Sequence, residues 1–161
     1  MTDEDVMRRA IELARQGELE PGGNPIGCMI VREGETVGEG YNEEQLRCDP
    51  TAHAEIVAIR RACERVGSEE LRGATLYSTL QPCGMCTMAS IWAKIGRIVY
   101  GAERHQVHKM YFEDRHLDTM DFIRDAFRRD LSIEGGVLGD ECAALYAGPD
   151  DIIPESEQAN L

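Results

Sequence analysis

The stretch that decides the fold is residues 74–101, ATLYSTLQPCGMCTMASIWAKIGRIVYG. Residues 74–80 are apolar and β-branched, which predicts a buried strand. Residues 83–93 have the character of a helix, and residues 95–101 predict a second strand. A strand, a helix and a strand at this spacing form the right-handed crossover unit of a parallel sheet. We therefore expect an α/β fold.

Upstream segments extend this unit into a larger sheet. Residues 26–31, IGCMIV, predict a buried strand, and a turn at 32–35 leads to an antiparallel partner at 36–41. A helix is expected from residue 51 to about residue 66, where Gly67 ends it. A hairpin followed by crossovers predicts a three-layer α/β/α sandwich with a central mixed five-stranded sheet.

The two ends of the chain supply the remaining elements. An amphipathic helix is expected at residues 3–16, with Gly17 as its stop. Beyond the second crossover strand, the pattern predicts a loop or short helix at 103–111, a helix at 117–129, a strand at 131–133 and a helix at 140–147. We expect a single domain over residues 1–147, followed by an acidic tail at 148–161 that either covers the pocket or stays disordered.

Composition narrows the class of protein. The chain has 161 residues, 42% of them hydrophobic and 29% charged, as in ordinary globular proteins. Its formal net charge of -13 disfavours a nucleic-acid partner, because a polyanion would be repelled. No stretch reaches the roughly 20 apolar residues of a membrane span, and the acidic start is not typical of a signal peptide. We therefore expect a cytoplasmic location and no membrane partner.

The cysteine motif indicates a metal. Six cysteines are too few for a disulfide framework, and Cys83 and Cys86 lie three residues apart at a helix start that favours thiolates. His53 is the obvious third ligand. Three protein ligands leave one position for water, which is the arrangement of catalytic zinc. Zinc lowers the pKa of such a water to about 7 and so provides a nucleophile.

Glu55 lies two residues after His53 and is the candidate for proton transfer. A carboxylate beside the metal can take a proton from the water, pass it to a ring nitrogen and later protonate the departing ammonia. His-x-Glu together with Pro-Cys-x-x-Cys is the signature of zinc deaminases. The alternative is a non-catalytic zinc-binding protein, but metal binding alone does not require Glu55.

Four stretches resemble the cytidine and deoxycytidylate deaminase superfamily, in its nucleobase and tRNA-adenosine branch. They are Pro25-Ile26-Gly27, Gly38-Glu39-Gly40-Tyr41-Asn42, Asp49-Pro50-Thr51-Ala52-His53-Ala54-Glu55-Ile56 and Leu80-Gln81-Pro82-Cys83-Gly84-Met85-Cys86. The resemblance implies the cytidine deaminase-like fold, one Zn2+ per chain and a homodimer in which the cysteine-motif helices pack together.

Within that branch the chain is most similar to bacterial guanine deaminases, through residues 49–55, Trp92-Ala93 and a Phe-acidic-Asp at 112–114. This similarity implies conversion of guanine to xanthine. It also implies that Asn42 binds the ring carbonyl, that the Ala54 backbone contacts the ring edge, and that Asp114 assists amine recognition or proton transfer.

Other substrates stay open. Ile26 stands where guanine deaminases tend to carry a stacking aromatic, Gln81 replaces a common glutamate, and the closing aromatic tail is missing. Thr79-Leu80 and Cys86-Thr87 resemble fungal-type cytosine deaminases, so cytosine or another nucleobase, nucleoside or triazine is an alternative. Residues 136–145 resemble the last helix of tRNA adenosine deaminases, which the acidic charge disfavours.

We expect structural roles for the remaining histidines, for three aromatic residues and for the cysteines outside the motif. We expect the histidines after residue 101 to be surface or pocket-rim residues rather than a second metal site; they are His105, His108 and His116. Three aromatic residues are expected in the core or pocket wall: Trp92, Tyr111 and Phe112. The cysteines outside the motif are expected to be small buried hydrophobes: Cys28, Cys48, Cys63 and Cys142.

Overall fold

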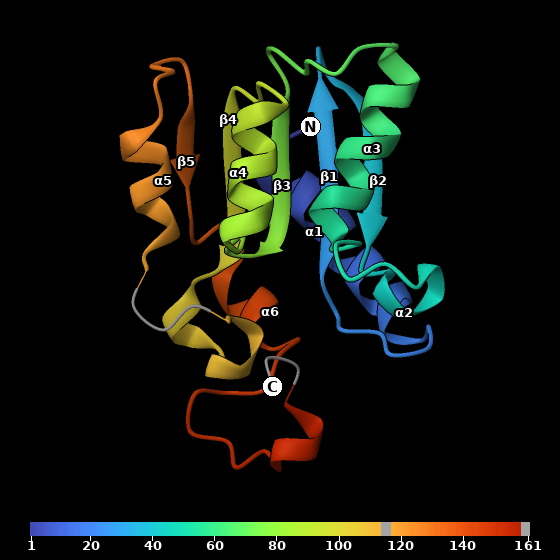
Figure 1. Ribbon diagram of the computed structural model, residues 1–161, viewed down its shortest axis with the longest axis vertical. Coiled ribbons are helices and arrows are strands. Elements are labelled where there is room, and N and C mark those ends of the chain that lie inside the picture. Colours follow the sequence, from blue (N-terminus) through green and yellow to red (C-terminus); the bar gives the residue numbers. More distant parts are fainter. Residues whose placement is uncertain (114–116, 159–161) are drawn as a thin grey trace.

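A computed structural model describes residues 1–113 and 117–158, and its centre is a five-stranded sheet (Figure 1). The strands are β1 (Gly27–Arg32), β2 (Glu35–Tyr41), β3 (Thr75–Leu80), β4 (Arg97–Ala102) and β5 (Ser132–Glu134), in the order β2-β1-β3-β4-β5. β1 is antiparallel to both neighbours, whereas β3, β4 and β5 are parallel. The prediction of a mixed sheet made from a hairpin and crossovers is confirmed.

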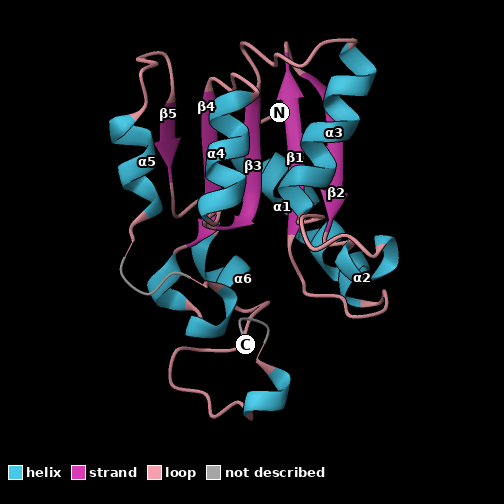
Figure 2. Cartoon of the chain, viewed as in Figure 1, coloured by secondary structure: helices cyan, strands magenta, loops and turns pink. Residues whose placement is uncertain are grey.

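Helices cover both faces of the sheet and complete the predicted three layers (Figure 2). On one face lie α1 (Asp3–Glu18) and α6 (Gly139–Ala143), and on the other lie α3 (Ala54–Val66), α4 (Gly84–Trp92) and α5 (Thr119–Asp125). The shorter helices are α2 (Glu44–Arg47), η1 (Arg104–Gln106), η2 (Lys109–Tyr111) and η3 (Glu155–Glu157). Among the described residues, no helix combines the length and apolar character needed to span a membrane.

Two hydrophobic clusters hold the layers together. In β3, Leu76 faces the cluster under α3 and α4 whereas Tyr77 faces the cluster under α1 and α6. Ile98 and Val99 alternate in the same way in β4. Because side chains alternate between the faces of a strand, a strand that is covered on both faces is apolar throughout. This explains the continuous apolar runs in the sequence.

Two glycines in β2 allow α3 to lie close against the sheet. A Cβ at Gly38 would lie 2.4 Å from the carbonyl oxygen of Ala58, and one at Gly40 would lie 3.0 Å from that of Ala54. Both contacts are with helix backbone, which cannot move without shifting α3. The missing side chains therefore set the distance between the end of β2 and the start of α3, where the candidate site lies.

Several predicted boundaries were wrong. Gly17 does not end the first helix but lies inside it, where a Cβ would come within 2.7 Å of Tyr41 Cβ, so close packing explains this glycine. The helix expected from residue 51 begins only at Ala54. The expected helices at 117–129 and 140–147 are shorter, and α2 was not predicted.

Some residues also have a different exposure from the one expected. Trp92 is not in the core, because 71% of its surface is exposed. Phe112 is buried and Tyr111 packs against the α1 cluster, as predicted. Of the four cysteines outside the motif, Cys28 and Cys142 are buried, Cys63 is partly buried and Cys48 is exposed. All six cysteines lie in the described ranges and are free thiols.

Candidate metal centre

The three predicted metal ligands meet where α3 and α4 begin. His53 is the N-cap residue of α3, Cys83 is the N-cap residue of α4, and Cys86 lies in the first turn of α4. Their ligand atoms all lie within 4.8 Å of one another. Nδ1 of His53 is 3.6 Å from the Sγ atoms of both cysteines. A tetrahedral zinc at its usual bond lengths separates a nitrogen and a sulfur ligand by about 3.6 Å, so these residues fit the metal.

Both helix starts use their N-cap residue for this cluster. N-cap side chains are usually Ser, Thr, Asp or Asn, which accept a hydrogen bond from the helix backbone. Among the described residues, no such side-chain bond caps α3 or α4. The side chains of His53 and Cys83 point instead toward each other and Cys86, where a metal ion would bind. The positive ends of two helix dipoles lie at this place and favour thiolates.

The three ligand side chains shift one another's pKa values. A hydrogen bond from Cys86, supported by one from His53, lowers the pKa of Cys83 to about 4 although burial opposes the shift. The bond to Cys83 and burial raise the pKa of Cys86 well above its ordinary value. Burial alone would lower the pKa of His53, yet its bonds to Cys83 and Glu44 raise it to about 11. Metal binding at these ligands therefore releases protons.

Glu55 lies in the first turn of α3 and is buried, with 4% of its surface exposed. Its Oε1 accepts a hydrogen bond of 2.9 Å from Ser78 Oγ in β3. Burial, followed by the negative charge of Cys83, raises the pKa of this carboxyl group. A raised pKa suits a group that must both take up and release a proton near neutral pH. Sequence reasoning missed Ser78, whose only signal was a hydroxyl in an apolar strand.

Asn42 directly follows β2, and its amide is held in a defined orientation. Its Oδ1 accepts a hydrogen bond of 2.8 Å from the Ala54 backbone nitrogen, and its Nδ2 donates to Glu44 Oε1 at 3.5 Å. Asn42 is buried and lies beside Ala54, the residue between His53 and Glu55. The structure thus places Asn42 and the Ala54 backbone next to the metal ligand His53, and their contact with a substrate ring stays a prediction.

The remaining predicted residues are less closely connected to the cluster. Ile26 directly precedes β1, is partly buried and packs against both hydrophobic clusters. Asp114 and His116 lie outside the described residues. The His105 side chain is 76% exposed and pairs with Glu103, whereas His108 is buried and accepts from the Met110 backbone nitrogen, so a rim position is wrong for His108. In the described ranges, His53, Cys83 and Cys86 form the only group with metal-binding geometry.

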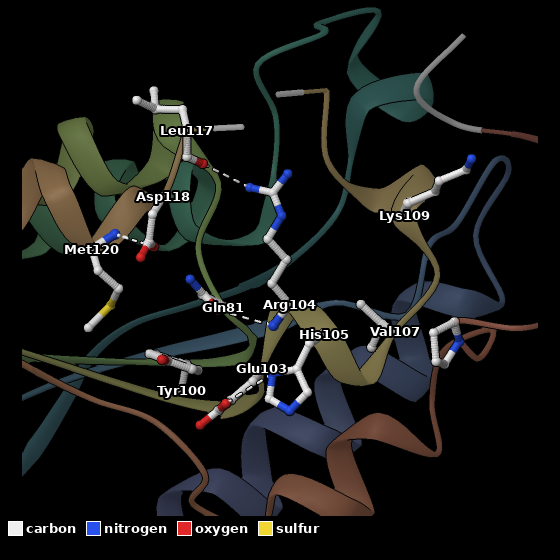
Figure 3. A pocket seen from close by; sticks show the side chains of 11 residues that line it. Gln81, Tyr100, Glu103, Arg104, His105, Val107, Lys109, Leu117, Asp118 and Met120 are labelled. Atoms are coloured by element: carbon white, nitrogen blue, oxygen red, sulfur yellow. Dashed lines mark hydrogen bonds and ion pairs between the residues drawn. The ribbon is translucent and has the colours of Figure 1, made fainter. Parts of the chain in front are cut away.

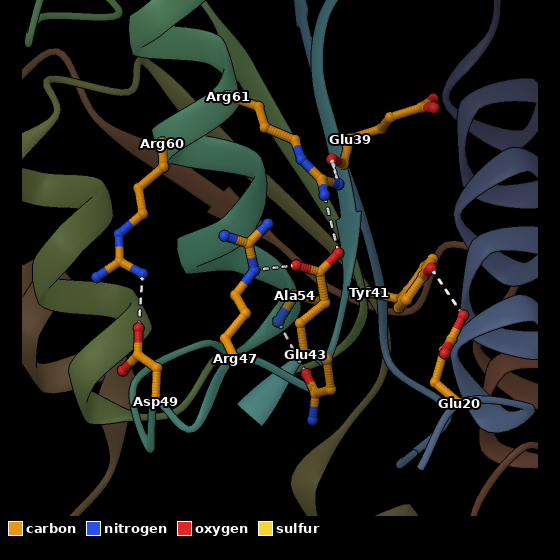
Figure 4. A network of polar contacts seen from close by, with 10 residues as sticks. Glu20, Glu39, Tyr41, Glu43, Arg47, Asp49, Ala54, Arg60 and Arg61 are labelled. Atoms are coloured by element: carbon orange, nitrogen blue, oxygen red, sulfur yellow. Dashed lines mark hydrogen bonds and ion pairs between the residues drawn. The ribbon is translucent and has the colours of Figure 1, made fainter. Parts of the chain in front are cut away.

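An ion-pair network anchors the segment between β2 and α3, and sequence reasoning missed it (Figure 4). Glu43 is 3% exposed and pairs with Arg47 and with Arg61 of α3, the latter at 2.8 Å. Asp49 pairs with Arg60 of α3 at 2.9 Å. Two arginines around one buried carboxylate meet the requirement that buried charges be paired. The segment is therefore fixed to the helix that starts at His53.

Two cavities lie near this end of the sheet. One of about 340 Å³ is lined by His53, Cys83 and Gly84 together with Glu113 and Leu117, so it opens onto the metal cluster. A larger one of about 610 Å³ contains none of the three ligands and is lined mainly by the segment around Arg104 (Figure 3). We assign the chemistry to the smaller cavity because it contains two of the metal ligands.

Gln81 connects the end of β3 to two later segments. Its Oε1 accepts a hydrogen bond from the Arg104 backbone nitrogen at 3.1 Å, and its Nε2 donates to Thr119 Oγ1 at 3.2 Å. The side chain therefore holds both the segment after β4 and the start of α5 next to the cysteine motif. A glutamine can do this because its amide offers both an acceptor and a donor.

The comparison with known families agrees with this geometry. Residues 1–102 match the model of the cytidine and deoxycytidylate deaminase zinc-binding region. The chain belongs to this deaminase family. Membership confirms the predicted zinc cofactor and makes the protein a hydrolytic deaminase.

Relatives in this family are named for different substrates. The guanine deaminase of Bacillus subtilis is 39% identical over 114 residues, which cover 71% of this chain and 73% of the relative. The tRNA-specific adenosine deaminase of Haemophilus influenzae is 35% identical over 147 residues, covering 88% and 79%. A solved structure from a study of A-to-I editing by tRNA:A34 deaminases has a TM-score of 0.74 and 33% identity, covering 88% and 98%. Both deaminase activities therefore occur among similar proteins.

Proposed function

We propose that this deaminase acts on a free nucleobase and converts guanine to xanthine. The observation that carries the proposal is the orientation of Asn42. Oδ1 accepts from the Ala54 backbone and one Nδ2 hydrogen is directed to Glu44, so the group that the amide can offer to a ligand is the second Nδ2 hydrogen, a donor. A donor suits a base with a ring carbonyl, such as guanine or cytosine, better than adenine, whose ring has none.

Similarity and charge support guanine further. The guanine deaminase of Bacillus subtilis shares 39% identity with this chain over the region that contains the whole cluster. The net charge of -13 opposes binding of a long polyanion. The catalytic domain in this proposal comprises residues 1–147, and the six free cysteines suit the reducing cytoplasm.

The proposed reaction replaces a carbon–nitrogen bond by a carbon–oxygen bond and releases ammonia. Zinc, when bound to His53, Cys83 and Cys86, supplies a Lewis acid that activates water. Glu55 takes one proton from the water and transfers it to a ring nitrogen. It then takes a second proton from the hydroxyl group added to the ring carbon and passes it to the amine, which leaves as ammonia while the ring carbonyl forms. Ser78 holds Oε1 of Glu55 in place for these transfers. Asn42 and the Ala54 backbone orient the ring, and Ile26 and Asp114 are the further substrate contacts that we propose.

We further propose that the chain forms a homodimer through α4. The outer side of this helix is apolar at Met85, Met88, Ala89 and Trp92, which recur at helical spacing. Met85 and Trp92 are exposed in the single chain, and 71% of the surface of Trp92 is accessible. Exposed aromatic and methionine side chains at such a spacing are typical of a protein interface.

The second candidate is a tRNA adenosine deaminase. It is favoured by the extent of the match, since the Haemophilus influenzae enzyme aligns with 88% of this chain, including most of the region after β4. The acidic surface disfavours it, because such an enzyme has to hold a phosphate backbone.

Ammonia release from a substrate panel tests these alternatives. Zinc-loaded protein would be assayed on guanine, cytosine, adenine, their nucleosides, triazines and a tRNA anticodon stem-loop, with Glu55→Gln as the inactive control. We expect turnover of guanine above all others. Turnover of the stem-loop alone, or tight binding of tRNA in a gel shift at low salt, would overturn the guanine proposal in favour of the second candidate.

A further inference from the structure

Glu44 contacts the metal ligand His53 on the side away from the cysteines. Oε1 of Glu44 lies 3.1 Å from Nε2 of His53, whereas Nδ1 of the same ring faces the two sulfur atoms. The two nitrogens of the imidazole thus have different partners. The ring is held between a carboxylate and the metal position.

We propose that Glu44 is a positioning residue that fixes His53 for zinc and joins it to the base-recognition amide of Asn42. A histidine that binds zinc through Nδ1 carries its proton on Nε2, and a carboxylate that accepts this proton's hydrogen bond fixes the tautomer and the ring orientation. It also makes Nδ1 a better electron donor to the metal. Such a partner strengthens zinc binding without touching the zinc.

The same oxygen of Glu44 has a second contact. Oε1 also accepts from Nδ2 of Asn42 at 3.5 Å, while Oδ1 of Asn42 accepts from the Ala54 backbone. One carboxylate therefore lies between the metal ligand and the amide that faces the substrate. Loss of Glu44 loosens both side chains together.

The backbone at Glu44 is fixed by contacts of the residue before it. The preceding residue, Glu43, is buried and pairs with Arg47 within α2 and with Arg61 on α3. The Glu43 backbone nitrogen also donates to the carbonyl oxygen of Ala52 at 2.9 Å, directly before His53. This double anchoring, of which Figure 4 shows the pairs of Glu43 with Arg47 and Arg61, holds the neighbouring Glu44 close to the start of α3.

The test measures zinc affinity rather than activity, so it does not depend on which base is the substrate. Zinc would be titrated into the metal-free full chain against a chromophoric chelator for wild type, Glu44→Ala and Glu44→Gln. We expect Glu44→Ala to weaken zinc binding by about 10- to 100-fold. Glu44→Gln keeps an oxygen acceptor and should lose less. The visible absorption of the cobalt-substituted protein should also shift in Glu44→Ala, because the geometry at His53 changes.

Glu64→Ala is the matched control, because Glu64 is an exposed glutamate on α3 and its loss changes the net charge equally. We expect wild-type zinc affinity for this variant. Thermal unfolding of each variant with saturating zinc checks that the fold is intact. Wild-type zinc affinity together with an unchanged cobalt spectrum in Glu44→Ala would overturn the proposal, as would an equal loss of affinity in Glu64→Ala.

Discussion

Helices α3 and α4 both begin at the metal cluster, at His53 and Cys83, and both lie on the same face of the sheet. Their outer sides are very different. α3 exposes Arg60, Arg61, Glu64 and Arg65, two of which form ion pairs with the segment before His53. α4 exposes Met85 and Trp92 instead.

This difference shows that the position of a helix start and the character of its outer side are set independently. The ends of β2 and β3 bring the two helix starts together, so both helices can supply metal ligands. The polarity of the outer side of each helix then depends on whether water or another protein surface covers it. Charged side chains suit water on α3, whereas the apolar side of α4 suits a second protein surface.

Removal of a metal ligand at either helix start should have the largest effect on zinc binding and turnover. His53→Ala and Cys83→Ala should each weaken zinc binding by more than the roughly 100-fold seen when only an outer partner of a ligand is lost, and both should lose turnover. Atomic absorption measures the metal, and thermal unfolding measures stability. A chelator should destabilise the wild type but neither variant; equal destabilisation of all three proteins would contradict this assignment.

Replacement of Glu55 should lower turnover without affecting zinc binding, because the proton-transfer group that we propose lies on α3 and is not a metal ligand. Glu55→Gln should lower turnover by about 10²- to 10⁴-fold while zinc content stays at the wild-type level. Steady-state kinetics on the best substrate of the panel and metal analysis of the same sample check this. If the variant keeps full turnover, Glu55 is not the proton carrier.

The support of Glu55 by Ser78 should have a smaller effect. Ser78→Ala removes one buried hydrogen bond, worth about 1 kcal/mol, and should lower kcat by roughly fivefold with little change in zinc content. Kinetics for Ser78→Ala and for Ser78→Thr, which restores the hydroxyl group, would test whether the hydrogen bond is responsible. No recovery of kcat in the threonine variant would argue against a role for the hydroxyl group.

The outer sides of the helices provide a test of association. Trp92→Glu on α4 should weaken the proposed dimer by at least about 2 kcal/mol, or roughly 30-fold, because it places a charge in an apolar interface. Arg65→Glu on the outer side of α3 is the control and should leave the dimer unchanged. Light scattering over a concentration series measures both, and a wild type that stays monomeric at every concentration would disprove the interface.

The smallest effect should come from Asp49. Bonds from the Thr51 hydroxyl and backbone, and from Arg60, lower the pKa of its carboxyl group from 3.8 to about 2. A lowered pKa means that the charged form stabilises the fold, fully above about pH 4 and less as the pH falls toward 2. A carboxyl titration by NMR should show Asp49 still ionised at pH 3.5, and a midpoint near 4 would contradict the contacts. Asp49→Asn should remove this part of the acid sensitivity.

The fold and the metal ligands could be predicted because their signals are local. Apolar runs such as residues 26–31 and 74–80 mark strands that are covered on both faces, and a short motif places Cys83 and Cys86 on one helix turn. Family resemblance singled out Asn42 and the Ala54 backbone, which lie hydrogen-bonded to each other next to His53, and their contact with a base stays a prediction.

The missed features depend on contacts between distant residues. α2 has four residues, and the buried Glu43 before it is fixed by a pair with Arg61 of α3, 18 residues further along the chain, which no local pattern reveals. Gly17 was misread because a glycine at a helix end and a glycine under a neighbouring ring look the same in sequence. For the same reason, the apolar character of Trp92 did not distinguish a core position from an outer surface.

The glycines of β2 have a consequence for how this enzyme tolerates change. Any side chain at Gly38 or Gly40 would push against the backbone or side chains of α3, the helix whose start carries His53 and Glu55. In a saturation mutagenesis library selected for deaminase activity, these two positions should therefore be depleted as strongly as the metal ligands. Attempts to change the substrate by directed evolution should keep β2 constant and vary the segment after β4 instead.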